Sequence, residues 1–303
     1  MKRDLISILD MEKDIQDVIS LALKVKRDRY SKRSELEGRT VGMIFEKPST
    51  RTRISLETAI TQLGGHGIYL NPNDMQMGRG ETVEDTAHVL SGFLDAITYR
   101  AFSHENVLKL AGNSSIPVIN ALDDAEHPLQ VLADFMTIAE KKGRTSNLKF
   151  SYVGDGNNMV NSLVLGCALL GMDMSIGTPE QYKPNEKYIA KAREIARLTG
   201  AKISATTNPK EAVADADVIY TDVWISMGEE KQKEIKEKAF KPFQVNSELV
   251  SEAKKDYIFM HCLPAHRGLE VTDEVADSIN SVIFQEAENR LHSAKAAFIT
   301  LIS

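Results

Sequence analysis

The chain has 303 residues, enough for about two domains of the usual size, and its composition of 42% hydrophobic and 26% charged residues is that of a folded protein. The net charge of −6 argues against nucleic acid or an anionic membrane as the main partner, because both bind broad basic surfaces. Two cysteines cannot build a disulfide framework or a four-cysteine zinc site, and no signal-peptide core or membrane-length apolar run is visible, so we expect a cytoplasmic protein.

Short β-like runs alternate with longer segments of helical periodicity along the chain. We predict strands at residues 40–45, 67–70, 96–99, 117–120, 149–153, 174–178, 202–206, 218–221, 257–261 and 282–284. We predict helices at residues 54–63, 82–92, 129–140, 159–170, 185–199 and 286–301. This alternation is typical of parallel sheets whose strands are joined by crossover helices. The expected fold class is therefore α/β.

A polar stretch at residues 141–147, which contains Gly143, divides these elements into two sets. We therefore expect two domains, each a parallel sheet flanked by helices. By its sequence alone, the last predicted helix could pack on either half. No internal repeat, low-complexity tract or heptad pattern is visible.

The loop after the first predicted strand reads Glu-Lys-Pro-Ser-Thr-Arg-Thr-Arg, residues 46–53. A strand that turns into a helix through Pro-Ser-Thr presents backbone N–H groups at a helix N-terminus, where the helix dipole favours an anion. Arg51 and Arg53 add guanidinium groups whose planar fork matches phosphate oxygens. The loop predicts a phosphate site, although a surface N-cap followed by solvated arginines has the same local pattern.

Further polar residues follow other predicted strands, and open α/β sheets bind ligands beyond the carboxyl ends of their strands. Arg100 ends one strand, and Asp222 follows another, where its carboxylate suits an ammonium group. His127 precedes a helix-opening proline, so its ring N–H can polarise a carbonyl while the Gln130 amide binds an NH2 group. Taken singly, each also fits a plain structural role, such as a helix cap or a charge at a sheet edge.

Three more features bear on the chemistry. Cys262, next to a histidine and before a proline turn, is a candidate reactive thiol, whereas Cys167 in an apolar helical stretch is expected to be structural. The sequence Gly-Asp-Gly-Asn-Asn-Met at 154–159 is similar to a dinucleotide-binding loop, but Met159 stands where the third glycine is required. We therefore expect no NAD, and we expect no other cofactor. A metal is not needed either, because the arginines supply the positive charge that a metal ion would bring.

Together these motifs resemble those of the aspartate/ornithine carbamoyltransferase family, in order and at family-like spacing from about residue 40 to residue 300. The resemblance is carried by Ser-Thr-Arg-Thr-Arg at 49–53, Arg100, His-Pro-Leu-Gln at 127–130, Asp-Val-Trp-Ile-Ser-Met-Gly at 222–228 and His-Cys-Leu-Pro at 261–264. The last two motifs point to ornithine rather than aspartate as the acceptor. The resemblance implies a carbamoyl phosphate-binding domain at 1–140, an ornithine-binding domain at 148–285, and a C-terminal helix, 286–303, that returns to the first domain.

The resemblance implies an enzyme that transfers the carbamoyl group of carbamoyl phosphate to the side-chain amine of L-ornithine, giving L-citrulline and phosphate. Implied ligands of carbamoyl phosphate are Ser49, Thr50, Arg51, Thr52, Gln76, Arg100, His127, Gln130, Cys262, Leu263 and Arg290. Implied ligands of ornithine are Asn158, Asp222, Ser226 and Met227. Arg100, His127 and Cys262 are the expected catalytic residues, with Thr52 joining the first two in an oxyanion hole for the tetrahedral intermediate.

The resemblance also implies a homotrimer or a multiple of trimers, with Gln76 delivered across a subunit interface, and a role in arginine biosynthesis. The sequence leaves open whether the enzyme works toward citrulline or toward its phosphorolysis. It also leaves open whether Cys262, Asp222 or the leaving phosphate takes the proton of the amine. Two alternative functions remain: a carbamoyltransferase for putrescine or a modified ornithine, and a non-catalytic phosphate-binding protein.

Overall fold

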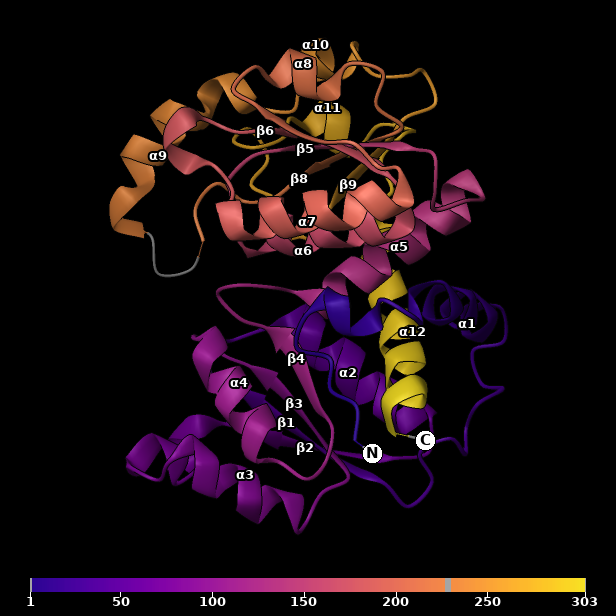
Figure 1. Ribbon diagram of the computed structural model, residues 1–303, viewed down its shortest axis with the longest axis vertical. Helices are drawn as coiled ribbons and strands as arrows, with labels where there is room; N and C mark the ends of the chain where they lie inside the picture. The colour runs from indigo at the N-terminus through magenta and orange to yellow at the C-terminus, as the bar shows by residue number, and fades with distance from the viewer. Residues whose placement is uncertain (1, 227–229, 303) are drawn as a thin grey trace. The chain divides into compact units, whose positions relative to one another are not determined.

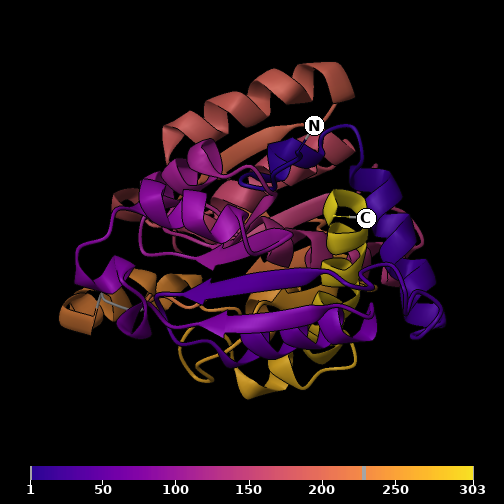
Figure 2. The same ribbon diagram turned by 90° about the horizontal axis from the view of Figure 1, so that it is seen from below.

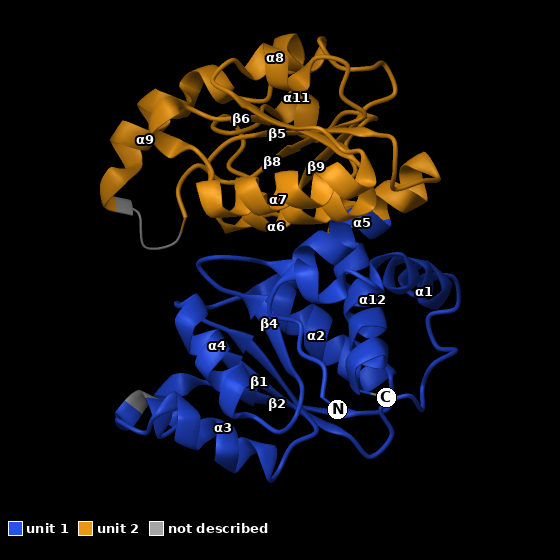
Figure 3. Ribbon diagram, in the orientation of Figure 1, with its two compact units in different colours: residues 1–136, 288–303 blue, residues 137–287 orange. Residues whose placement is uncertain are grey.

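The computed structural model describes residues 2–226 and 230–302, which form two compact units (Figures 1 and 3). Unit 1 contains residues 1–136 and 288–303, and unit 2 contains residues 137–287. Both divisions fall inside helices, the first in α5 (Pro128–Lys142) and the second in α12 (Ile283–Ile302). Among the described residues, no helix is both long and apolar enough to cross a bilayer.

Unit 1 is built on a four-stranded parallel sheet of order β2-β1-β3-β4. Its strands are β1 (Thr40–Phe45), β2 (His66–Leu70), β3 (Ala96–Arg100) and β4 (Val118–Leu122). Its helices are α1 (Ile15–Arg27), α2 (Thr50–Gln62), α3 (Val83–Ser91) and α4 (His104–Asn113), with the adjoining parts of α5 and α12. Figure 2 shows the strand arrows of this sheet running side by side in one direction.

Unit 2 is built on a five-stranded parallel sheet of order β7-β6-β5-β8-β9. Its strands are β5 (Lys149–Val153), β6 (Asp173–Gly177), β7 (Ile203–Thr206), β8 (Val218–Thr221) and β9 (Ile258–His261). Its helices are α6 (Asn158–Leu170), α7 (Glu186–Thr199), α8 (Pro209–Val213), α9 (Lys233–Phe240), α10 (Ser247–Val250) and α11 (Asp273–Ala276). Helices α6 and α7 cover one face of the sheet, and α8, α10 and α11 lie on the other (Figure 1).

Both sheets are buried by apolar residues, as expected of parallel strands covered on two faces. In unit 1, Ile44, Ile97 and Tyr99 pack with Val107 and Leu110 of α4 into one core cluster. In unit 2, a second cluster contains Trp224, Phe240 and Phe243. The Phe240 ring lies 5.7 Å from that of Trp224 and 4.9 Å from that of Tyr182, measured between centroids. This aromatic packing anchors the segment that follows β8.

The α/β class and the two parallel sheets are confirmed, and nine of the predicted strands are present to within two residues at each end. The strand predicted at 282–284 is wrong. Phe259 of β9 donates its N–H to the Asn280 oxygen at 2.8 Å, and Val282 donates to the Phe259 oxygen at 2.9 Å. The chain makes this single bridge to the sheet edge and then enters α12 at Ile283, because the Glu286 N–H already closes a helical turn on the Val282 oxygen at 2.9 Å.

Candidate active site

The N-terminus of α2 is formed by the Pro-Ser-Thr sequence after β1. Ser49 is its N-cap, and the hydroxyl accepts the backbone N–H of Thr52 at 3.3 Å. Thr50, the first helical residue, is exposed, and Arg51 is half-buried. The remaining N–H groups of the first turn and the positive end of the helix dipole therefore meet at one place, which suits an oxyanion.

Two guanidinium groups converge on the hydroxyl of Thr52. Arg100 enters from the end of β3, since the parallel register pairs it with Phe45 at the end of β1. Its Nη1 lies 3.5 Å from Thr52 Oγ1, and Nη2 of Arg290, on α12, donates to the same oxygen at 2.6 Å. Thr52 is 1% exposed and each arginine 7%. Two nearly buried cations that converge on one hydroxyl at a helix N-terminus make a strong site for a dianion.

His127 lies directly before α5 and is 4% exposed. Burial, followed by the charges of Arg290 and Arg100, holds the pKa of His127 well below its usual value of 6.5. The imidazole is therefore neutral at physiological pH, and it can donate one N–H to an oxygen without adding a third positive charge.

Gln130 is fully buried in the first turn of α5, and its Nε2 donates to Asp134 Oδ1 at 2.8 Å. Because a carboxylate only accepts hydrogen bonds, this contact fixes which end of the amide faces Asp134. The Gln130 side-chain oxygen is the end suited to accept from an NH2 group.

Two further residues that the sequence singled out, Arg53 and Gln76, are at least partly exposed. The Arg53 guanidinium stacks 3.7 Å from the centroid of the Tyr69 ring and lies 3.5 Å from Glu57, so it is engaged on the surface of unit 1. Gln76 is exposed and caps a short 3-10 helix, Met77–Arg79. Its assignment as a ligand stays a prediction.

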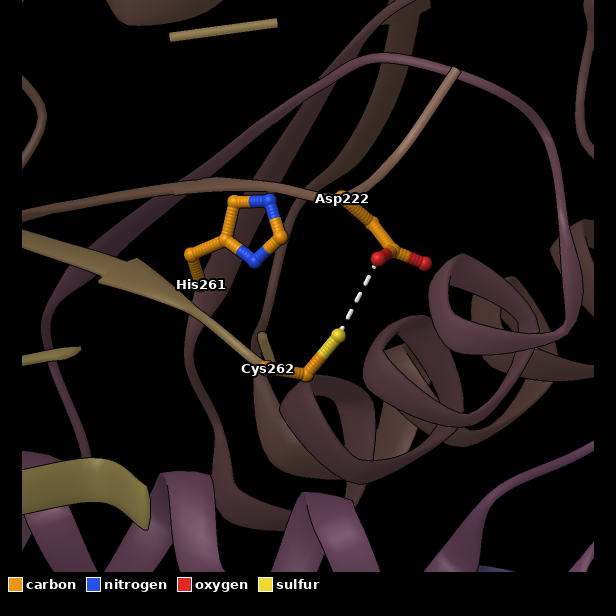
Figure 4. A group of neighbouring side chains, drawn as sticks. All are labelled: Asp222, His261 and Cys262. Carbon is orange, nitrogen blue, oxygen red and sulfur yellow. Dashed lines mark hydrogen bonds between the residues drawn. The ribbon is translucent and has the colours of Figure 1, made fainter. Parts of the chain in front are cut away.

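In unit 2, Asp222, Cys262 and Asn157 form a hydrogen-bonded group where β8 and β9 end. Asp222 is 6% exposed. Its Oδ1 accepts from Cys262 Sγ at 3.1 Å (Figure 4). The same oxygen accepts from the Val223 N–H at 2.8 Å, and Oδ2 accepts from Asn157 Nδ2 at 2.8 Å. Neutral donors thus hold the carboxylate in one orientation, which suits a cationic ligand.

The Asn157 contact was missed by the sequence prediction, which selected its neighbour Asn158. Asn157 is the N-cap of α6, where its Oδ1 accepts the backbone N–H groups of Met159 at 2.9 Å and Val160 at 3.4 Å. Its amide nitrogen is then turned toward Asp222. The Asn-Asn pair carries no signal that tells which residue caps the helix, so only the structure separates them.

His261 fixes the turn next to Cys262. Its Nδ1 accepts the Leu263 N–H at 2.9 Å, so Nε2 carries the proton and faces Glu270 Oε1 at 3.2 Å. Leu263 adopts a φ of +58° and precedes a cis proline. Asp222, His261 and Cys262 offer atoms within 4.8 Å of one another, as a metal site would. Since both His261 nitrogens are engaged, this arrangement favours a hydrogen-bonded thiol over a metal centre.

Three further residues were predicted for the acceptor site. Asn158 is half-buried as the first residue of α6, and Ser226 is half-buried after Trp224. Met227 lies outside the described residues. The roles assigned to all three stay predictions.

The Gly-Asp-Gly loop at 154–156 has a packing explanation. A Cβ on Gly156 would lie 2.4 Å from the backbone carbon of Lys183 and 2.5 Å from the nitrogen of Pro184, and the Gly156 N–H donates to the Tyr182 oxygen at 2.9 Å. The glycine is needed because the chain at residues 182–184 passes against it.

A buried ion pair near this loop was also missed. Asp155 Oδ2 accepts from Lys236 Nζ at 2.7 Å, and the two side chains are 10% and 3% exposed. Lys236 belongs to α9, the helix after the acceptor segment, and it lies in a charged sequence that reads as a solvated helix face. A lysine inside the run Lys-Glu-Ile-Lys-Glu-Lys gives no local sign of burial.

Comparison with known sequences and structures bears directly on this arrangement. The sequence profile of the carbamoyl-P binding domain of aspartate/ornithine carbamoyltransferase matches residues 3–140, and the profile of the Asp/Orn binding domain matches residues 146–301. The chain belongs to the aspartate/ornithine carbamoyltransferase family.

Individual members of the family match over the whole chain. A protein of Thermoplasma acidophilum, named a catabolic ornithine carbamoyltransferase, is 66% identical over 100% of this chain and 99% of its own length. The structure of ornithine carbamoyltransferase from Pyrococcus furiosus superposes with a TM-score of 0.95 at 50% identity, covering 99% of this chain and 97% of that one. The structure of an anabolic ornithine carbamoyltransferase from Campylobacter jejuni gives a TM-score of 0.94 at 42% identity, covering 99% of each chain.

Proposed function

We propose that this enzyme transfers the carbamoyl group of carbamoyl phosphate to the side-chain amine of L-ornithine, giving L-citrulline and phosphate. The observation that carries the proposal is the convergence of Arg100 and Arg290 on Thr52 at the start of α2, next to a neutral His127. The family membership and the two domain profiles support the same substrates.

In the proposed reaction the phosphate lies on the first turn of α2, with Ser49, Thr50, Arg51 and Thr52. The neutral amine of ornithine attacks the carbamoyl carbon, a C–N bond forms, and the carbonyl electron pair moves onto oxygen. Arg100, His127 and the Thr52 hydroxyl donate to that oxyanion. Collapse of the tetrahedral intermediate breaks the C–O bond and releases phosphate, and the amine proton leaves to the Asp222 and Cys262 pair or to the phosphate.

On the acceptor side, the geometry supports Asp222 as the partner of an ammonium group, oriented by Asn157 and Cys262. A side-chain amine with a pKa near ~10.4 must lose its proton before it can attack. A carboxylate and thiol that already share a hydrogen bond at 3.1 Å give this proton a short route.

A turnover assay with carbamoyl phosphate and a panel of amines tests the acceptor. Ornithine should exceed putrescine in kcat/KM by roughly 10^3-fold or more, because putrescine lacks the carboxylate and leaves polar groups of the site unpaired. Comparable rates for the two amines would favour a carbamoyltransferase that also acts on putrescine. Turnover of a modified ornithine alone would favour a carbamoyltransferase specific for that amine.

Arg51→Ala tests the phosphate site. The variant should fold, because Arg51 is half-buried on the first turn of a capped helix, and it should lose carbamoyl phosphate affinity by about 100-fold in titration calorimetry. Arg53→Ala is the matched control, since Arg53 is engaged with Tyr69 and Glu57 and should keep its affinity within about threefold. If Arg51→Ala binds carbamoyl phosphate with wild-type affinity, the proposed phosphate site at the start of α2 is wrong.

For the physiological direction, we infer that the enzyme works toward phosphorolysis of citrulline rather than in arginine biosynthesis. The inference rests on the word catabolic in the name of the Thermoplasma acidophilum relative, which is more similar to this chain than the anabolic enzyme of Campylobacter jejuni. Deleting the gene should then abolish growth that depends on citrulline without creating a requirement for arginine. An arginine requirement would restore the biosynthetic assignment. A cytoplasmic location and a trimeric assembly are part of the same proposal.

A further inference from the structure

The turn that precedes His127 is organised by the carboxylate of Asp123. This side chain is fully buried, and its Oδ1 accepts the backbone N–H groups of Ala125 at 2.8 Å and Glu126 at 2.7 Å. Its Oδ2 accepts from Asn120 Nδ2 at 2.8 Å and lies 2.6 Å from His104 Nδ1. One carboxylate therefore receives four hydrogen bonds, two of which fix the backbone immediately before His127.

The same turn holds a strained residue. Leu122, the last residue of β4, has a φ of +133°, a conformation that side chains other than glycine rarely adopt. Its N–H donates to Asn120 Oδ1 at 3.0 Å, and its register partner on β3 is Arg100. Such strain persists only where the surroundings over-determine the backbone. The contacts around Asp123 supply that constraint between Arg100 and His127.

A buried carboxylate needs a compensating positive group, and His104 is placed to supply it. It is the first residue of α4, its side chain is 27% exposed, and its backbone N–H donates to Asp124 Oδ1 at 2.7 Å. The hydrogen bond to Asp123 raises the pKa of His104, and the charges of Asp123, Glu126 and Asp124 act in the same direction against the effect of burial.

Lys47 is a further cation whose charge interacts with this group. Asp123 and Asp124 raise its pKa, but burial and Arg100 outweigh them and lower it. The two histidines on either side of the turn therefore have pKa values shifted in opposite directions: that of His104 is raised, whereas that of His127 is lowered.

We propose that His104 is a positioning residue for carbamoyl transfer: as an imidazolium it compensates the charge of Asp123, and Asp123 in turn holds the strained turn that places His127. The proposal rests on the function proposed above and concerns how its oxyanion donors are kept in place. As the pH rises and His104 loses its proton, the turn loses its charged partner. The contribution of His104 to the rate is therefore confined to lower pH.

The test compares wild type with His104→Gln across pH 6 to 9. We expect the ratio of their kcat/KM values to be about tenfold or more at pH 6 and to fall toward unity at pH 9, since small misplacements of catalytic groups cost rates of this order. Titration of the ornithine amine cancels in this ratio. His88→Gln, at an exposed position on α3, is the matched control and should show a ratio near unity throughout. A ratio for His104→Gln that does not change with pH would overturn the proposal.

NMR titration of the His104 ring gives a readout that is independent of turnover. The imidazole should titrate above pH 6.5 in the wild type and at lower pH in Asp123→Asn. Titration at or below 6.5 in the wild type would overturn the proposal, even if Asp123→Asn does not fold. Absence of carbamoyl transfer by the wild type would overturn the proposed function instead, while a raised pKa of His104 that depends on Asp123 would still establish the pairing.

Discussion

His127 combines burial, two neighbouring cations and a position directly before α5. A protonated imidazole in this place would repel Arg100 and Arg290 and compete with them for the phosphate. The neutral ring adds a directional N–H donor for the carbonyl oxygen without changing the charge of the site. In the proposed mechanism, the lowered pKa of His127 separates two tasks: the arginines neutralise the phosphate, and the histidine polarises the carbonyl.

The lowered pKa of His127 has a consequence for stability. In the unfolded chain this residue binds a proton as the pH falls through about 6.5, whereas in the folded protein it stays neutral to lower pH. The neutral His127 therefore contributes to the free energy of unfolding above the pKa of the unfolded chain. This contribution is lost as the pH falls below that pKa, by up to about 1.4 kcal/mol per pH unit. Urea unfolding between pH 7.5 and 5 should show a smaller acid loss for His127→Gln than for wild type. Parallel curves would contradict a neutral buried His127.

At the scale of the elements, the buried Lys236–Asp155 pair ties α9 to the loop after β5. Lys236→Met would remove the ammonium that pairs with this buried carboxylate, so we expect a loss of about 3 to 5 kcal/mol in urea unfolding and a larger effect on the KM of ornithine than on carbamoyl phosphate affinity. Lys233→Met on the same helix is the matched control, because its ion pair with Glu237 is exposed and 3.8 Å long.

The double variant Asp155→Asn with Lys236→Met separates a buried charge from lost packing. It should recover at least half of the stability lost in Lys236→Met, since neither charge is then left uncompensated. A double variant as unstable as the single one would show that the lysine stem, and not its charge, holds α9.

The strands also show how much of the secondary structure can be predicted from the sequence. Strands β1, β5 and β8 begin and end where the sequence predicts, because short runs rich in apolar, β-branched or aromatic residues between polar segments mark buried parallel strands. The run at 282–284 has the same composition, yet it opens α12, because a three-residue apolar run fits a helix start as well as a strand.

Some residues of the proposed site could be predicted from the sequence, and others could not. Those at strand ends and helix starts, such as Arg100, His127 and Asp222, are visible in the sequence because their position alone places them at the carboxyl edge of a sheet. Asn157 and Lys236 are not, since their roles depend on contacts between elements that no local pattern encodes. The Asp123–His104 contact is of the same kind, joining two residues 19 positions apart.

At the scale of the whole molecule, two helices carry the chain between the units, and both carry site residues. His127 and Gln130 lie at the start of α5, and Arg290 lies on α12, which brings the end of the chain back to Thr52. A residue near position 290 therefore completes a group whose other members lie between 49 and 130. The proposed carbamoyl phosphate site therefore cannot be isolated by cutting the chain after α5.

The proposed trimer makes a prediction about mixed subunits. Gln76 is exposed, and the family resemblance assigns it to the active site of a neighbouring subunit. If so, Gln76→Ala and Arg51→Ala damage the same site from different chains. Each variant alone should be inactive or nearly so. Subunits mixed at random in equal amounts should form sites with both residues intact in about a quarter of cases, because each site then draws its two halves independently.

The measurement is carbamoyl transfer after the two variants have been unfolded together and refolded. About a quarter of wild-type activity is expected when both chains are present, and next to none when either is refolded alone. Mixing Arg51→Ala with Thr52→Ala is the control, because both residues lie on α2 and belong to the same half of a site. Every chain in this mixture then carries a defect in that half, so exchange of subunits cannot restore an intact site. Activity that fails to rise in the Gln76 and Arg51 mixture, while size measurements show mixed trimers, would place Gln76 in its own subunit's site or outside any site.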